Sequence, residues 1–74
     1  MIYSTEQDKK RVTEIVQAEL SQRRMIIDEN YIRQIVEDIM NISYSIGGDY
    51  SRSVITKITT TYFEREFYKK FFQD

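Results

Sequence analysis

SRSVITKITTTYFEREFYKKFF is the stretch that decides the fold predicted for this chain, and it covers residues 51–72. Val54, Ile55, Ile58 and Tyr62 recur in it at helical spacing, which places them on one face of a helix. The chain has six Tyr and four Phe, and six of these ten rings lie in this stretch, so it carries much of the large apolar surface. We therefore expect a helix over about residues 51–72.

A strand is the alternative for residues 54–61, because β-branched residues are abundant there and favour strands. The stretch does not alternate cleanly between apolar and polar residues, as a half-buried strand would. Its continuation places Glu66 and Lys70 four residues apart, a spacing that suits an ion pair on a helix. A helix is the preferred interpretation.

A second apolar stripe follows from the same helical spacing. Phe63, Phe67 and Phe71 recur every four residues and lie roughly 160° round the helix from the first stripe. Tyr68 and Phe72 fall between the two stripes. Because a helix that is apolar on two sides needs cover on two sides, we expect another surface to cover the second stripe.

The first of two further helices covers about residues 4–23. Ser4 followed by Gln7 fits a capping box at its start. Apolar residues then recur at positions i, i+3, i+4 and i+8, the pattern of an amphipathic helix. These residues are Val12, Ile15, Val16 and Leu20.

The second helix covers about residues 28–46. Asp28 is a favourable N-cap residue, and isoleucines then recur at alternating steps of three and four, as in a heptad pattern. Gly47 and Gly48 follow, and glycine is favoured just past a helix end. The isoleucines are Ile32, Ile35, Ile39, Ile42 and Ile46.

The three helices predict an all-α fold, a three-helix bundle formed as a single small domain over residues 1–74. A chain of this length buries only about 60% of its unfolded surface. Without Cys there are no disulfides to add stability, so we expect the bundle to oligomerise. The predicted core contains Val12, Ile15, Val16, Leu20, Ile32, Ile35, Val36, Ile39, Ile42, Val54, Ile55, Ile58 and Tyr62.

The sequence offers little for catalysis. It has no His and no Cys, which removes the usual nucleophile–base pairs and nearly all structural zinc sites. Carboxylates such as Glu37 and Asp38 are adjacent in sequence, and adjacent residues do not face each other on a helix. We predict no catalytic residue, no metal ligand and no cofactor, in a protein that is not an enzyme.

The charge balance also limits the partners. There are 11 basic and 12 acidic residues, a net charge of −1, whereas proteins that grip nucleic acid electrostatically are usually basic. No apolar run approaches the roughly 20 residues of a membrane span, and the first residues lack the features of a signal peptide. We expect a cytoplasmic protein that does not bind membranes.

The second stripe is the basis of the predicted function. Exposed contiguous apolar patches usually mark interaction sites, and aromatic residues are enriched at the centres of interfaces. We predict a non-enzymatic protein-interaction module, a small regulator, inhibitor or adaptor. It would bind a second copy in a homodimer, the commonest closed assembly, or a foreign target protein. The predicted interface contains Phe63, Phe67, Tyr68, Phe71 and Phe72, with Arg65 and Lys70 as a charged rim.

The junction before the last helix leaves two alternatives open. Residues 47–53 read GGDYSRS, and glycines before a helix N-terminus can cradle a phosphate through backbone N–H groups. This alternative predicts a nucleotide or another small ligand. Residues 51–58 also resemble the recognition helix of helix-turn-helix DNA-binding proteins. That resemblance implies DNA contacts from Ser51, Arg52, Ser53, Thr56 and Lys57.

Overall fold

The computed structural model describes residues 5–72 of the chain. Within them it contains three α-helices, one short 3-10 helix and no strand. In chain order the elements are α1 (Glu6–Gln22), α2 (Glu29–Ser45), α3 (Arg52–Glu64) and the 3-10 helix η1 (Phe67–Phe72).

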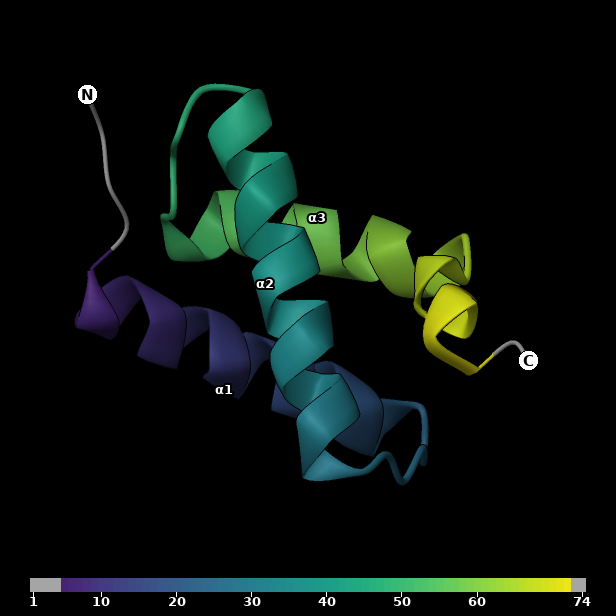
Figure 1. Ribbon diagram of the computed structural model, residues 1–74. Coiled ribbons are helices and arrows are strands. Elements are labelled where there is room, and N and C mark those ends of the chain that lie inside the picture. Colours follow the sequence, from purple (N-terminus) through teal and green to yellow (C-terminus); the bar gives the residue numbers. More distant parts are fainter. Residues whose placement is uncertain (1–4, 73–74) are drawn as a thin grey trace.

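Each α-helix packs against the other two. In Figure 1, α2 passes in front of α1 and α3 and crosses both. The predicted all-α three-helix bundle is confirmed, and residues 54–61 are helical rather than extended. None of the helices in the described part of the chain is long and apolar enough to cross a membrane.

The first two helices begin at side chains that cap backbone N–H groups. Thr5 Oγ1 accepts the backbone N–H of Asp8 at 3.1 Å, and Asp8 Oδ2 accepts that of Thr5 at 3.0 Å, which is a capping box. The box predicted from Ser4 lies partly outside the described residues. Asp28 caps α2 as predicted, because its Oδ1 accepts the backbone N–H of Asn30 at 2.9 Å.

All three α-helices are followed by residues with left-handed backbone conformation. Gly47 follows α2 with φ 138°, and the Gly48 N–H donates to the Ser43 carbonyl at 2.9 Å, so the predicted stop at the glycines is confirmed. Arg24 follows α1 with φ 56°, and Glu66 follows α3 with φ 58°. Residues with a Cβ atom rarely adopt this conformation.

The prediction of one helix over residues 51–72 is wrong in its second half. α3 ends at Glu64, the left-handed Glu66 turns the chain, and η1 follows. A continuous helix would carry the second stripe away from the bundle. The turn instead brings Tyr68 onto Phe63, with 5.2 Å between the ring centroids, so burial of apolar rings offsets the helical hydrogen bonds that are lost.

The predicted core is largely confirmed. Ile32, Ile42 and Ile58 are only partly buried and pack against it, and Val54 is also partly exposed. Met40, Tyr50 and Phe63 belong to the core although they were not predicted there. The predicted core residues that are buried are Val12, Ile15, Val16, Leu20, Ile35, Val36, Ile39, Ile55 and Tyr62.

Candidate protein-binding surface

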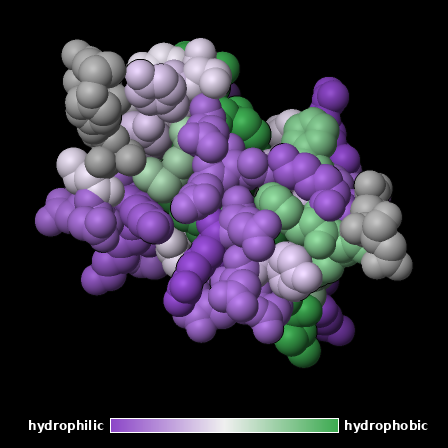
Figure 2. Space-filling view, in the orientation of Figure 1, coloured by the Kyte–Doolittle hydropathy of each residue, from purple (hydrophilic) through white to green (hydrophobic). Residues whose placement is uncertain are grey.

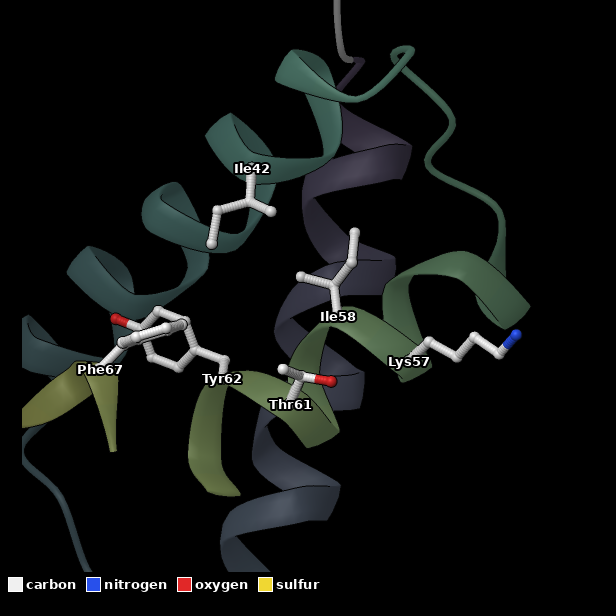
Figure 3. Close-up of a pocket in the computed structure, with 6 residues that line it drawn as sticks. All are labelled: Ile42, Lys57, Ile58, Thr61, Tyr62 and Phe67. Carbon is white, nitrogen blue, oxygen red and sulfur yellow. The ribbon is translucent and has the colours of Figure 1, made fainter. Parts of the chain in front are cut away.

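An apolar groove of about 230 Å³ opens between α2 and α3, next to η1. Figure 3 shows Ile42 of α2 on one side and Ile58 and Thr61 of α3 on the other, with Tyr62 and Phe67 at one end. In the same view α1 passes behind the groove. We call it the α2–α3 groove, and its lining residues are Ile42, Lys57, Ile58, Thr61, Tyr62 and Phe67.

The helical period explains why α3 supplies most of this lining. Its contributing residues occupy positions i, i+1, i+4 and i+5, which share one face of a helix. The buried face of the same helix, which carries Ile55, Thr59 and Phe63, is turned into the core. α3 therefore contributes both to the core and to the wall of the groove.

Two apolar side chains on the elements that form the groove are exposed, Phe67 in its lining and Ile46 at the end of α2. Ile46 lies one helical turn beyond Ile42 and is 67% exposed, and Phe67 is 45% exposed. Phe67 packs edge-to-face on Tyr62, with 5.8 Å between ring centroids. In Figure 2, hydrophobic side chains gather where α3 meets η1, beside a hydrophilic strip along α2.

Asp38 of α2 fixes the end of the groove. Its Oδ2 accepts a hydrogen bond from the Tyr62 hydroxyl at 2.8 Å and lies 2.6 Å from Lys70 Nζ of η1. Burial, together with the neighbouring Asp38 carboxylate, raises the pKa of Tyr62 above its usual range. Tyr62 therefore remains a neutral donor, and the same carboxylate holds both α3 and η1 against α2.

Tyr62→Phe should lower the free energy of unfolding by about 0.5–1.5 kcal/mol at pH 7, because it removes this hydrogen bond. The raised folded-state pKa means that the hydroxyl's contribution is complete below the unfolded pKa of about 10 and declines as the pH rises above it. The difference in stability between native protein and variant should therefore shrink above pH ~10. Urea denaturation across this pH range measures it.

Tyr44→Phe is the matched control for that prediction. Tyr44 lies on α2 and is 50% exposed. Its replacement should therefore leave unchanged the way in which the free energy of unfolding varies with pH. If the free energy of unfolding of Tyr62→Phe differed from that of the native protein by the same amount at every pH, the result would contradict the stabilising hydrogen bond assigned to this hydroxyl.

The residues of the predicted aromatic interface do not share one exposed face. Phe63, predicted at the interface, is 2% exposed and belongs to the core. The helix break is the reason, because it folds η1 back over this ring. Tyr68 and Phe71 are partly buried against the core. Phe67 and Phe72 remain about half exposed.

The two residues predicted to form a charged rim lie in different surroundings. Arg65 is exposed at the end of α3. Lys70 pairs with Asp38, and its ammonium lies 5.3 Å from the centre of the Phe71 ring. Lys70 thus anchors η1, whereas Arg65 faces solvent.

The predicted DNA-contacting residues are all exposed at the start of α3. Residues 46–51 separate this helix from α2, whereas the turn of a helix-turn-helix motif usually has three or four residues. The structure gathers the five side chains without reproducing that turn. They are Ser51, Arg52, Ser53, Thr56 and Lys57.

The glycine junction presents a carboxylate at the start of α3. Asp49 Oδ1 accepts the backbone N–H of Ser51 at 2.8 Å, and the Ser51 side chain makes no capping bond. This hydrogen bond lowers the pKa of Asp49, so the group is ionised at neutral pH. A phosphate approaching residues 47–53 would meet this negative charge.

A second, more polar groove of about 420 Å³ lies between α1 and the first half of α2. Acidic and basic side chains alternate around it, including Glu14, Lys10 and Arg33, which is typical of a solvated surface. Within residues 5–72, no three acidic side chains gather closely enough to hold a metal ion.

Comparisons of the chain with protein families, with curated proteins and with solved structures found no match.

Sequence reasoning missed how the groove is assembled. It placed Ile42 and Ile58 in the core and Lys57 among DNA contacts, whereas the structure brings all three to one opening. One signal was available for Ile46. The glycines end α2 directly after it, so the last isoleucine of the pattern has no following turn to help cover it.

Proposed function

We propose that the chain is a non-enzymatic protein-interaction module that binds another polypeptide through the α2–α3 groove. The observation that carries the proposal is an apolar groove whose lining includes the half-exposed side chain of Phe67. Exposed apolar surface of this kind usually marks an interaction site. Burial of one apolar side chain there contributes about 1.5–3 kcal/mol.

The dimensions suit a side chain of a partner protein. A cavity of about 150 Å³ lined by aliphatic and aromatic residues holds benzene, so a groove of about 230 Å³ can take one large apolar side chain. Aromatic residues are enriched at the centres of interfaces, and the aromatic rings of Tyr62 and Phe67 line one end of this groove. We therefore expect the aromatic end of the groove, where Asp38 binds Tyr62 and Lys70, to contribute most of the binding free energy.

The test is a selection of binding peptides from a displayed library of random helical peptides. Recovered peptides should bind the native chain and lose about tenfold or more in affinity for Phe67→Glu, since they lose one buried apolar contact. Ile26→Glu is the matched control, because Ile26 is fully exposed in the α1–α2 connection and lies outside the groove.

Circular dichroism of both variants verifies that the helices remain folded. Two outcomes would refute the proposed function. One is that no peptide is recovered. The other is that the recovered peptides bind the folded Phe67→Glu variant as tightly as the native chain.

A further inference from the structure

The 3-10 helix η1 is more loosely attached than the three α-helices. Among the described elements, it is the one that contains no buried residue. In Figure 1 it folds back at the end of α3, drawn in yellow. Its contacts with α2 include the ion pair of Lys70 with Asp38 and the packing of Phe72 on Tyr31. Segments with few buried residues open at a lower free energy than the core, so η1 can leave α2 while the α-helices stay folded.

The turn that leads into η1 has little stabilisation of its own. Glu66 has φ 58°, a left-handed conformation that residues with a Cβ atom rarely adopt. Its carboxylate lies 2.8 Å from Lys69 Nζ, but both side chains are more than half exposed, and exposed ion pairs add little stability. The turn therefore depends on the contacts that η1 makes with the rest of the bundle.

The same residues also suit a straight continuation of α3. With Glu66 in the ordinary helical conformation, Glu66 and Lys70 lie one turn apart, in the favoured order for an ion pair. The backbone groups of the turn then regain helical hydrogen bonds. Lys70 thus has a carboxylate partner in either arrangement, which is Asp38 when η1 is folded back and Glu66 when the helix is straight.

We propose that η1 is a strap that switches between these two arrangements and thereby controls the α2–α3 groove. In the docked state, which is the one described above, Lys70 pairs with Asp38. In the released state the chain straightens at Glu66, α3 continues through η1, and Lys70 pairs with Glu66. The inference rests on the proposed function, because it names the regulation of the same groove.

The position of Phe67 couples the strap to the groove. Figure 3 shows this side chain beside Tyr62 at the end of the groove, with 5.8 Å between the ring centroids. On a straight helix Phe67 would follow Tyr62 by five residues and lie about 140° from it round the axis, on the side away from the groove. Release of the strap therefore removes Phe67 from the lining, and only the docked strap completes the groove.

Relaxation-dispersion NMR of the full chain tests the switch, because it detects minor states that exchange in microseconds to milliseconds. Residues 66–72 should exchange with a minor state whose backbone chemical shifts are those of a helix. Shifts of an unstructured chain would show only a fraying end and would overturn the inference. Absence of exchange in both the native chain and Asp38→Asn would overturn it as well.

Two substitutions should move the balance in opposite directions. Glu66→Gly should lower the released population by about threefold, because glycine adopts the left-handed conformation without steric cost but loses more entropy when ordered. Asp38→Asn should raise it by up to about fivefold, the usual range for a partly exposed ion pair. Arg33→Gln is the matched control, since it removes the exposed pair of Arg33 with Glu29 on α2. A released population that responds equally to all three substitutions would contradict the switch.

The change of partner by Lys70 predicts an order among the variants. Asp38→Asn removes the partner of the docked state alone, whereas Lys70→Gln removes the ion pair of both states. Asp38→Asn should therefore raise the released population more than Lys70→Gln does, and the reverse order would contradict the change of partner. Asn also keeps an oxygen that can accept the hydrogen bond of Tyr62, so α3 keeps this contact with α2.

Peptides selected for the groove test its control by the strap. Asp38→Asn combined with Phe72→Ala weakens both contacts of η1 with α2 and should shift the strap strongly towards release. The affinity of this double variant for the peptides should fall in proportion to the docked fraction that NMR measures. Glu66→Gly should bind them at least as tightly as the native chain.

The two proposals fail in different ways. If no peptide is recovered, but a helical minor state responds to the substitutions as expected, the proposed function is refuted and the switch stands. If the peptides lose affinity for Phe67→Glu, but bind the released double variant as tightly as the native chain, the proposed function stands and control by the strap is overturned.

Discussion

Phe63→Ala should lower the free energy of unfolding by about 3–5 kcal/mol, the usual cost of truncating a buried phenylalanine. The ring is 2% exposed, lies 5.2 Å from Tyr68, and is covered by the guanidinium of Arg23 at 5.8 Å. Its removal leaves a cavity between α3 and η1. Urea denaturation, at a protein concentration low enough to exclude association, measures the loss.

Phe67→Ala is the matched comparison for this prediction. Phe67 is 45% exposed, so the same truncation removes fewer buried contacts and should cost less than half as much. A single continuous helix would place both rings on one stripe and give the two variants similar costs. Equal losses of stability would therefore contradict the helix break at Glu66.

Thr59→Val should raise the free energy of unfolding by about 1–3 kcal/mol. Thr59 is fully buried on α3, and its hydroxyl has no hydrogen-bond partner among the described residues. Valine has nearly the same shape and the same branching at Cβ, so the variant removes an unsatisfied polar group and leaves the packing unchanged. Thermal and urea denaturation would both report the gain.

Thr56→Val is the control for the effect of Val on helix formation. Thr56 lies on the exposed side of α3, where substitutions usually change stability by less than about 0.5 kcal/mol. A Thr59→Val variant that is less stable than the native protein would show that the hydroxyl is hydrogen-bonded after all, for example to a buried water molecule.

The elements that could be predicted from the sequence are those governed by local rules. The isoleucine pattern identified α2 and the centre of the core, Asp28 marked the start of that helix, and Gly47 marked its end. Each of these signals acts within a few residues. They can therefore be read from the sequence without knowledge of contacts that are distant in the chain.

The division of the aromatic stripe could not be predicted in this way. Glutamate has no preference for left-handed backbone, so nothing local to Glu66 indicates a turn there. The turn is stabilised by contacts distant in sequence, such as the pairing of Lys70 with Asp38 and the packing of Phe72 on Tyr31. The groove depends on this turn, because Phe67 reaches Tyr62 from the start of η1.

The left-handed residues Arg24 and Glu66 affect how readily the protein can acquire new properties. A residue with a Cβ atom in this conformation carries roughly 1–2 kcal/mol of backbone strain. Substitution by glycine would remove this strain, but glycine loses more backbone entropy on folding, so the net increase in stability would be smaller. Neither position lines the α2–α3 groove. Stability can thus be increased at helix ends that do not line the groove, and a chain stabilised there would tolerate destabilising substitutions elsewhere, including in the groove.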